Sequence, residues 1–336
     1  MVGTGAVGAR AARQLVDVAG LTEVTIVDTN AAQAAAVAGS LGPPSIVGQW
    51  EPDDLAVGDV VLLACPVPHA DLAREAVRRC AHVVSLADEI DDVRALLALD
   101  GNARRLGVSV AVGAGFAPGL TCVLARHAAA GFDSVDEVHV AKAGTGGPAC
   151  ARQHHGALTE QSLDWRDGEW ASRRGGSGRE LCWFPDPLGA LDCYRGGLPD
   201  ALLLVPAFPG VRRVTARVAA SRRDRLTARL PMLRQPHPEG LLGAARVEVR
   251  GRRGPGTDVC VLGALDRPAI AAGIVAGVTA AWALQGRLSR IGAAGLGELV
   301  GEPVAFLHEL ARRGVRAAAF EGAGSATTTA TAPPAG

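Results

Sequence analysis

Short runs of apolar and β-branched residues alternate with amphipathic segments over roughly the first 120 residues of the chain. The short runs are typical of buried strands, and the segments with apolar residues at helical spacing are typical of helices. The predicted strands are 24–27, 59–64, 82–86 and 108–112. The predicted helices are 7–19, 30–41, 70–80 and 90–106. This alternation predicts the α/β class, with a parallel, doubly wound sheet and right-handed crossovers.

The pattern changes after Pro118, where longer connections rich in glycine and arginine separate the strand-like segments. The further strands are predicted at 135–141, 211–218, 245–249 and 259–264, and the further helices at 268–286 and 301–313. We therefore expect a doubly wound domain at 1–120 and an α+β domain with a mixed sheet at 121–265. C-terminal helices at 266–321 are expected to pack back on the first domain. The remainder, 322–336, lacks periodicity and is expected to be a disordered tail.

A glycine-rich turn precedes the first predicted helix. Its G-x-G-x-x-G pattern consists of Gly3, Thr4, Gly5, Ala6, Val7 and Gly8. In a dinucleotide-binding turn the first glycine permits the tight turn, the second lets backbone N–H groups approach a pyrophosphate, and the third allows close packing. Asp28 follows the predicted strand 24–27 and is expected to accept hydrogen bonds from the adenosine ribose. Because a carboxylate there repels a 2′-phosphate, the sequence predicts a Rossmann domain that prefers NAD to NADP.

The strand that should precede this turn is almost missing from the sequence. A Rossmann sheet needs a buried strand of about five residues before the first glycine, and this chain offers only Met1 and Val2. Without that strand, its two neighbours would expose unpaired backbone edges. We therefore expect a truncated first strand and a native protein that begins further upstream.

The loop after the predicted strand 59–64 is expected to pass the nicotinamide, because ligands of parallel sheets bind at the carboxyl ends of the strands. It begins with Cys65, Pro66 and Val67. A nucleophilic role for Cys65 is a weaker alternative, since no neighbour in the sequence suggests a lowered pKa. A proton-donor role for His69 is weaker too, because a histidine at a helix start is most often solvated.

Composition narrows the classes of partner. Lys+Arg and Asp+Glu both number 34, which gives a formal net charge of +0, and aromatic residues make up only 4%. Nucleic-acid binding and attraction to an anionic membrane are therefore not expected. The longest apolar run, 269–284, is shorter than the roughly 20 residues that span a bilayer and predicts a buried helix. The seven cysteines form no CxxC pair, so we expect no metal site and a cytoplasmic protein with reduced thiols.

Three segments of the first 145 residues resemble the saccharopine dehydrogenase-like (saccharopine reductase) family. These are 59–66, 82–88 and, most specifically, 112–120, which is close to the signature G-x-G-[FM]-x-P-G-[LIV]. The signature residues are Gly115, Phe116, Pro118 and Gly119. The resemblance implies an oxidoreductase of amino acid metabolism that transfers a hydride between a nicotinamide and a carbon bonded to nitrogen. It also implies an amino-acid-like substrate, and by analogy a homodimer formed through the middle sheet.

The signature itself predicts a sharp turn into a helix. Pro118 fixes φ and Gly119 permits a close backbone approach, so the helix is expected to start near Leu120 with its N-terminus toward an interdomain cleft. Free N–H groups there would suit a substrate carboxylate or the carboxamide of nicotinamide. A plain domain hinge is the alternative interpretation, and the two are compatible.

Candidate substrate residues follow the first strand of the second domain. Lys142 is the only lysine of the chain and precedes a glycine loop with Thr145, Gly146 and Gly147, similar to the strand, loop and helix of dihydrodipicolinate reductase. We expect Lys142 to act as an acid or a carboxylate anchor.

Two histidines and one arginine complete the candidates. His154 is expected to be a second catalytic residue and His155 a substrate contact, although on a helix at most one of the two should face the cleft. Arg195 is expected to hold a carboxylate, since a guanidinium binds it in bidentate fashion. A homoserine dehydrogenase-like or dihydrodipicolinate reductase-like reductase and a non-catalytic NAD-binding sensor remain as alternatives.

Overall fold

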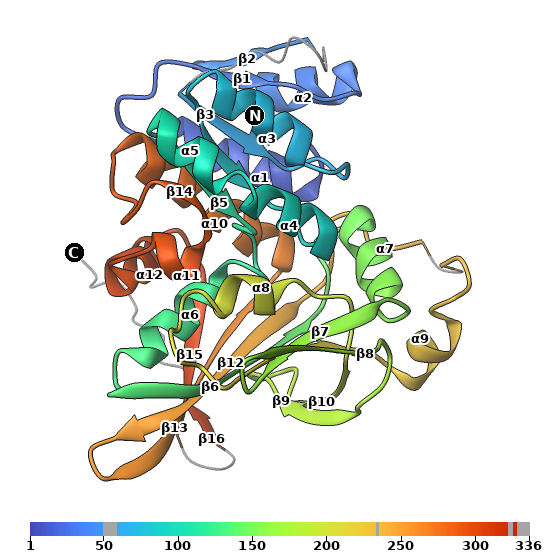
Figure 1. Ribbon diagram of the computed structural model, residues 1–336. Coiled ribbons are helices and arrows are strands. Elements are labelled where there is room, and N and C mark those ends of the chain that lie inside the picture. Colours follow the sequence, from blue (N-terminus) through green and yellow to red (C-terminus); the bar gives the residue numbers. More distant parts are fainter. Residues whose placement is uncertain (50–58, 233–234, 322–324, 328–336) are drawn as a thin grey trace, which may run out of the picture.

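The structure, a computed structural model, describes residues 1–49, 59–232, 235–321 and 325–327 (Figure 1). Two sheets organise these residues. The smaller strands of the N-terminal region lie at one end of the molecule, and a ten-stranded mixed sheet lies at the other. Helices α6 (Leu120–Ala129) and α8 (Asp200–Leu204) lie between them and contact the larger sheet.

The N-terminal sheet is parallel throughout. Its strands are β1 (Val24–Ile26), β2 (Ser45–Val47), β3 (Val60–Leu63), β4 (His82–Ser85), β5 (Ser109–Val112) and β14 (Gly292–Gly295). They form a four-stranded part in the order β14-β5-β4-β3 and a two-stranded part, β1-β2. Strands β3, β4 and β5 are almost wholly buried, and most of their residues are apolar, as expected for a sheet covered on both faces.

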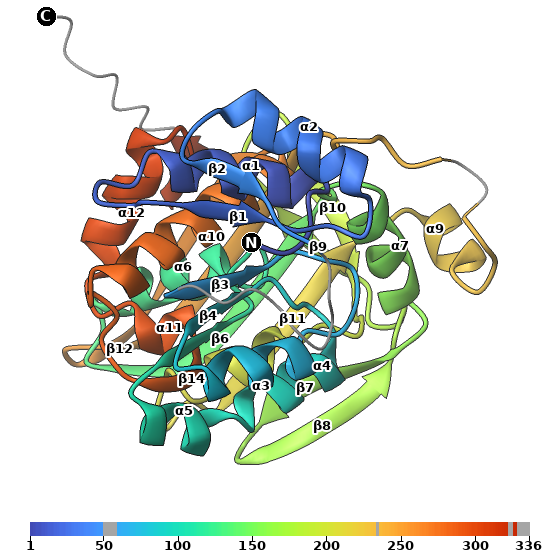
Figure 2. The ribbon, with the colours of Figure 1, turned by 90° about the horizontal axis from the view of Figure 1, so that it is seen from above.

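Helices cover the N-terminal sheet on two faces. Helices α1 (Ala6–Val16) and α10 (Pro268–Leu284) lie on one face, and α3 (Ala70–Arg78), α4 (Ile90–Leu97) and α5 (Asp100–Leu106) on the other (Figure 2). Helix α2 (Ala31–Leu41) packs against β1 and β2. Together these elements form the doubly wound arrangement that the sequence predicts.

Helix α10 ties the C-terminal part of the chain to the first motif. A Cβ atom on Gly273 would lie 2.5 Å from the Cβ of Arg10, and one on Gly277 would lie 2.4 Å from the Cβ of Gln14. Only glycine therefore allows α10 to approach α1 this closely. The helix is buried along almost its whole length, as the apolar run predicts. Across the described ranges, no helix has both the length and the apolar character that a membrane crossing requires.

Among the described residues, Val2 bridges the two parts of the N-terminal sheet. It forms isolated parallel bridges to Val27 and Leu63, and its N–H donates to the Leu62 carbonyl oxygen at 2.8 Å. The α-amino group of Met1 donates to the carbonyl oxygen of Thr25 at 2.6 Å. Beyond these contacts, a groove of about 670 Å³ separates β1 from β3. The N-terminal sheet is thus interrupted between β1 and β3.

The larger sheet is built mostly from the middle of the chain. Its strands are β6 (Ser134–Ala143), β7 (Gln161–Arg166), β8 (Glu169–Arg174), β9 (Glu180–Trp183), β10 (Ala190–Tyr194), β11 (Arg213–Ala219), β12 (Gly243–Arg253), β13 (Gly256–Asp266), β15 (Arg316–Glu321) and β16 (Ser325–Thr327). The order is β16-β15-β13-β12-β6-β11-β10-β9, with β7 pairing β11 and β8. Strand β6 is central, antiparallel to β12 and parallel to β11. Helices α7 (Pro148–Ala157) and α9 (Arg222–Thr227) flank this sheet.

Several elements depart from the sequence expectations. The helix expected at 90–106 is two helices, α4 and α5, with Leu99 at the junction. The segment 266–321 is not purely helical: besides α10, α11 (Leu296–Leu299) and α12 (Pro303–Arg312), it supplies β14 to the first sheet and β15 to the second. Its glycine and alanine strands lack the β-branched residues that the prediction relied on.

The tail expected from 322 is partly ordered, because Ser325–Thr327 pairs with β15. Residues 322–324 and 328–336 lie outside the described residues.

Candidate functional site

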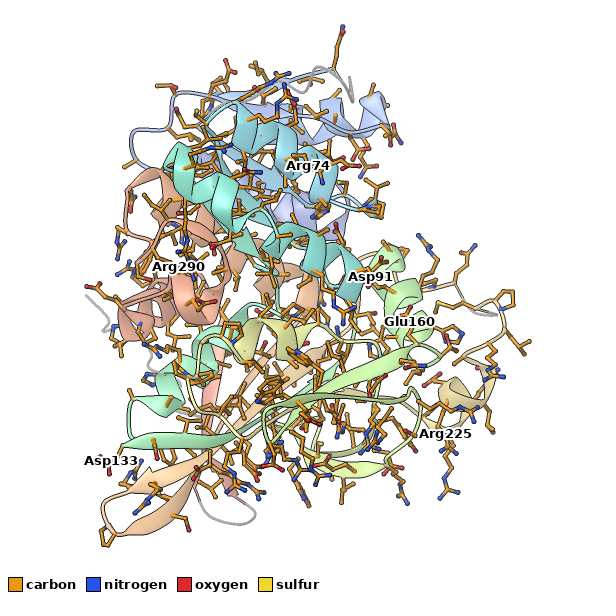
Figure 3. The ribbon with its side chains drawn as sticks, in the orientation of Figure 1. Arg74, Asp91, Asp133, Glu160, Arg225 and Arg290 are labelled. Carbon is orange, nitrogen blue, oxygen red and sulfur yellow. The ribbon has the colours of Figure 1, made fainter. Side chains whose placement is uncertain are left out.

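A cavity of about 660 Å³ lies where the carboxyl ends of the parallel strands face the second sheet. The first domain contributes the loops after β3, β4 and β5. The second contributes the end of β6, the loop that follows it and α7, and Pro268 and Ala272 of α10 close one side. Figure 3 shows Glu160, which follows α7 and lines the cavity, close to Asp91 of α4. Both domains therefore build one site.

The glycine-rich turn stands at the edge of this cavity. Gly3 has φ +94°, and a Cβ there would lie 2.7 Å from the backbone of Ala64 and Cys65. A Cβ on Gly8 would lie 2.0 Å from the carbonyl oxygen of Gly3, whereas a Cβ on Gly5 would meet nothing within 4 Å. Gly3 and Gly8 are thus required for packing. Gly5 faces open space at the N-terminus of α1, which has no side-chain cap, and such an end suits an anionic group.

Asp28 fastens the same turn to the end of β1. Its Oδ2 accepts hydrogen bonds from the backbone N–H and the hydroxyl of Thr4, both at 2.6 Å, and its Oδ1 accepts one from the N–H of Asn30 at 2.8 Å. Burial opposes the charged form, but these hydrogen bonds outweigh it and lower the pKa of Asp28. The carboxylate is therefore ionised and fixed beside the glycine turn.

The loop after β3 is held by a buried histidine. The Nδ1 of His69 lies 2.8 Å from the Ser85 hydroxyl, and its Nε2 lies 3.0 Å from the carbonyl oxygen of Cys65. The carboxylate of Asp92 accepts from the backbone N–H of His69 and Ala70 at 2.9–3.0 Å. Both ring nitrogens are engaged, so His69 supports the loop of Cys65 rather than donating a proton into the cavity. Burial raises the pKa of the Cys65 thiol, which also argues against a nucleophile.

The signature loop after β5 turns sharply into α6. Gly119 has φ +124°, and a Cβ there would lie 2.2 Å from the carbonyl oxygen of Gly115. The Leu120 N–H donates to that same oxygen at 2.9 Å, so it is not free for a ligand as the sequence interpretation supposed. Gly115, Phe116 and Pro118 line the cavity, while Leu120 is buried.

Lys142 reaches the cavity from the end of β6. Its ammonium donates to the carbonyl oxygen of Ala117 at 3.1 Å and lies 4.0 Å from Oδ2 of Asp88. Asp88 follows β4, and the side chain of Gln153 on α7 also favours its charged form. Burial raises the pKa of Asp88 to about 6, and the ammonium of Lys142 limits that rise.

His154 also lines the cavity, but as a neutral ring. Its Nε2 lies 3.0 Å from the carbonyl oxygen of Ala219, which fixes the proton on that nitrogen. Burial lowers the pKa of His154 to about 4, and the nearby charge of Lys142 acts in the same direction. Near neutral pH this ring therefore has no second proton to give.

Two predicted substrate residues lie elsewhere. The Nε2 of His155 lies 3.0 Å from the carbonyl oxygen of Leu230, and the residue does not line the cavity. Arg195 is paired with Asp164 at 3.5 Å in the second sheet and does not reach the cavity either. Of the loop glycines, Gly146 lines the cavity with Thr145. Gly147 lies against the start of α1, since its Cβ would be 3.0 Å from the Cβ of Ala6.

Sequence reasoning missed the acidic side of the cavity. Asp88, Glu89, Gln153 and Glu160 line it, and Glu160 has its pKa raised by burial and by neighbouring carboxylates. The position of Asp88 directly after a parallel strand was the available signal, because such positions meet at one edge of the sheet.

Comparison with known proteins gives a likeness of fold. No family model matches the chain, and no curated protein sequence does. Saccharopine dehydrogenase (L-Glu forming) from Saccharomyces cerevisiae aligns with a TM-score of 0.68 and 14% identity, over 95% of this chain and 99% of that chain. The predicted Rossmann fold with a second α+β domain, and the likeness to saccharopine dehydrogenase, are thereby confirmed for the fold.

Two other solved structures are less similar. GenD2 from gentamicin A biosynthesis, in complex with NAD, has a TM-score of 0.46 and 16% identity, over 96% of this chain and 95% of that one. The amine dehydrogenase from Mycobacterium smegmatis has a TM-score of 0.47 and 11% identity, over 90% of this chain and 96% of that one. Neither is close enough to carry an argument about this site.

Proposed function

We propose that the protein is an NAD-dependent oxidoreductase that transfers a hydride at a carbon bonded to nitrogen in an amino-acid-like substrate. The observation that carries this proposal is the continuity of the glycine turn at α1 with the cavity that contains Lys142. Val7 of the turn lines that cavity together with the loops after β3 and β5. The fold shared with saccharopine dehydrogenase supports the same class of reaction.

The residues present fit a dinucleotide. The open space at Gly5 and the uncapped start of α1 suit the pyrophosphate, and the ionised Asp28 suits the hydroxyls of an adenosine ribose. The loop of Cys65, Pro66 and Val67 would then flank the nicotinamide. When bound, this cofactor supplies or accepts the hydride. A 2′-phosphate would meet the negative charge of Asp28, so NAD is favoured over NADP.

The chain's own groups perform the remaining tasks. Lys142 places a positive charge between the Ala117 carbonyl and Asp88, where it would hold a substrate carboxylate or orient the substrate nitrogen. The apolar walls formed by Phe116, Pro118 and Ala272 exclude water from the reacting carbon.

The direct test is a substrate panel. Purified protein is incubated with NAD or NADP and with amino acids and secondary amines made from two amino-acid-like halves, saccharopine among them, while reduced cofactor is followed by absorbance. We expect turnover with NAD for at least one secondary amine. Absence of both turnover and cofactor binding by calorimetry would refute the proposal.

A variant separates an enzyme from a sensor that only binds NAD. Lys142→Met should leave NAD affinity within about twofold, because the partners of Lys142, Ala117 and Asp88, lie outside the glycine turn, and should reduce turnover by roughly 10²-fold or more. Undiminished turnover would remove Lys142 from its assigned role.

A further inference from the structure

Among the carboxyl groups that line the cavity and that the preceding roles leave unused, Asp88 is the one that faces the ammonium of Lys142. Asp88 stands at the carboxyl end of β4, on the first domain, and faces Lys142 and Gln153 on the second. It lines the same cavity as the loop expected to flank the nicotinamide. It is thus near the reacting atoms and is contacted from both domains.

We propose that Asp88 is the catalytic group that exchanges a proton with the substrate nitrogen, while Lys142 supplies the compensating charge. This inference rests on the proposed function. It differs from the sequence interpretation, which assigned proton transfer to Lys142 or His154.

The alternatives are less suited to proton transfer. His154 has its Nε2–H directed to the Ala219 carbonyl oxygen, and with a pKa of about 4 its free nitrogen is a weak base. Cys150 also lines the cavity, but burial raises the pKa of its thiol. Asp200 is buried, does not line the cavity and accepts a hydrogen bond from the Thr121 hydroxyl at 3.3 Å, so it does not face a ligand.

Asp88 itself has a pKa of about 6, which is close to the pH at which a general base is most efficient. The titratable and charged groups that face it from the surrounding elements are Lys142, Glu89, Asp200, Cys150 and Glu160.

The proton and electron balance is complete with the groups named. A secondary ammonium substrate gives one N–H proton to the Asp88 carboxylate and becomes a neutral amine. The C–H bond at the adjacent carbon then breaks, and its electron pair leaves with the hydrogen as hydride to the oxidised nicotinamide. The nitrogen lone pair forms the C=N bond of an iminium ion. Asp88 finally releases its proton to solvent, and in the reverse direction it returns a proton to the nitrogen.

The kinetic test compares variants over pH with the panel compound that the wild type oxidises fastest. The wild-type rate of amine oxidation should fall below about pH 6, because protonation of Asp88 removes the base. Asp88→Asn should lower the rate by roughly 10²–10⁴-fold, and its pH–rate profile should lack this fall at low pH, the acidic limb. His154→Asn should keep the limb. The matched control is Asp91→Asn, an exposed carboxylate on α4 paired with Arg94, which should keep both rate and limb.

A second measurement needs no substrate. Carbon-13 NMR of aspartate-labelled, cofactor-free protein should show one carboxyl resonance that titrates near pH 6 and is missing from Asp88→Asn. Lys142→Met should move its midpoint upward, because a stabilising positive charge is lost. Titration of that resonance near the ordinary value of about 4, or an acidic limb that survives in Asp88→Asn, would overturn the inference. Failure of the wild type to oxidise any compound would instead overturn the proposed function.

Discussion

Two glycines of the opening motif are expected to fail in different ways when replaced by alanine. In Gly8→Ala the new Cβ would lie 2.0 Å from the Gly3 carbonyl oxygen, at least 1 Å closer than ordinary contacts. Gly3 cannot retreat, because its own Cα faces the Ala64 backbone and its N–H donates to the Val27 carbonyl oxygen at 2.8 Å. In Gly5→Ala the Cβ would meet nothing within 4 Å. The first substitution should therefore damage the fold, and the second should spare it.

The size of each effect follows from competing contributions. Alanine is favoured over glycine inside a helix by about 1 kcal/mol, and this opposes the clash at Gly8. Overpacking of a fixed site costs about 1–3 kcal/mol and occasionally more, and a contact of 2.0 Å belongs at the upper end, so we expect a net loss of about 2 kcal/mol in the free energy of unfolding. With about 2.1 cal/mol/K per residue over 336 residues, that loss lowers Tm by roughly 3 °C. Gly5 is the N-cap residue of α1, and its replacement by alanine should lower the free energy of unfolding by less than about 1 kcal/mol.

Thermal unfolding and calorimetry with NAD measure the two effects separately. Gly5→Ala should bind NAD at least about tenfold more weakly, a loss of about 1.4 kcal/mol, because its methyl group occupies the space in which a pyrophosphate approaches the start of α1. Its Tm without cofactor should stay near that of the wild type. Wild-type NAD affinity in Gly5→Ala, or wild-type Tm in Gly8→Ala, would refute this assignment of roles.

Three further predictions concern cofactor choice, packing and the interrupted sheet. Asp28→Asn should narrow the preference for NAD over NADP by roughly ten- to a hundredfold, as measured in binding titrations with both cofactors. This change corresponds to the loss of charge-assisted hydrogen bonding that contributes about 1.5–3 kcal/mol. Because the folded protein lowers the pKa of Asp28, the ionised carboxylate stabilises the fold at pH values above the unfolded pKa of about 3.9. This contribution is lost as the pH falls through the folded pKa, so the free energies of unfolding of the variant and the wild type should converge there. Trp282→Ala should lower the free energy of unfolding by about 3–5 kcal/mol in chemical denaturation, because the ring is 1% exposed and its Nε1 donates to Glu309 at 2.9 Å. In the control Trp183→Ala the ring is 56% exposed, and the loss should be less than about 1 kcal/mol. Five alternating valine and alanine residues fused before Met1 should raise Tm relative to a glycine–serine extension of equal length. Such a strand would fill the groove between β1 and β3 and replace an α-amino group whose pKa burial lowers to about 6; equal Tm values would contradict this.

The sequence predicted the first domain well because its signals are local. The periodicity of each strand and helix, the glycine turn and the residue Asp28 all lie within short segments, and a parallel sheet assembles such segments in one way. The same rule placed the loops of Cys65 and Phe116 at one edge of the sheet, where they now line the cavity. By contrast, β14 and β15 carry few β-branched residues and form only because neighbouring strands offer an edge, which no local pattern reveals.

The predicted substrate residues divide along a similar line. Lys142 and His154 follow from their place after a strand and on the next helix, and both reach the cavity. Arg195 was chosen for its chemistry alone, and the structure shows a closer partner for it in Asp164, which also binds Arg217 at 3.1 Å. In a chain with many arginines, a buried carboxylate on the same sheet competes with any ligand for each guanidinium, and sequence does not show which carboxylate is near.

Asp88 illustrates what the assembly of two domains adds. Taken alone, the end of β4 offers a half-buried carboxyl beside another acid, Glu89, and such a pair would favour the protonated form. The end of β6 brings Lys142 to within 4.0 Å and α7 brings Gln153, and both favour the ionised form. These opposing influences leave the pKa of Asp88 at about 6, so the carboxyl group can lose and regain a proton near neutral pH. Burial is the largest influence on Asp88, so a motion that separated the domains would return its pKa toward the ordinary value even though Lys142 is withdrawn. A pKa of about 6, which suits proton exchange near neutral pH, is therefore a property of the closed cavity.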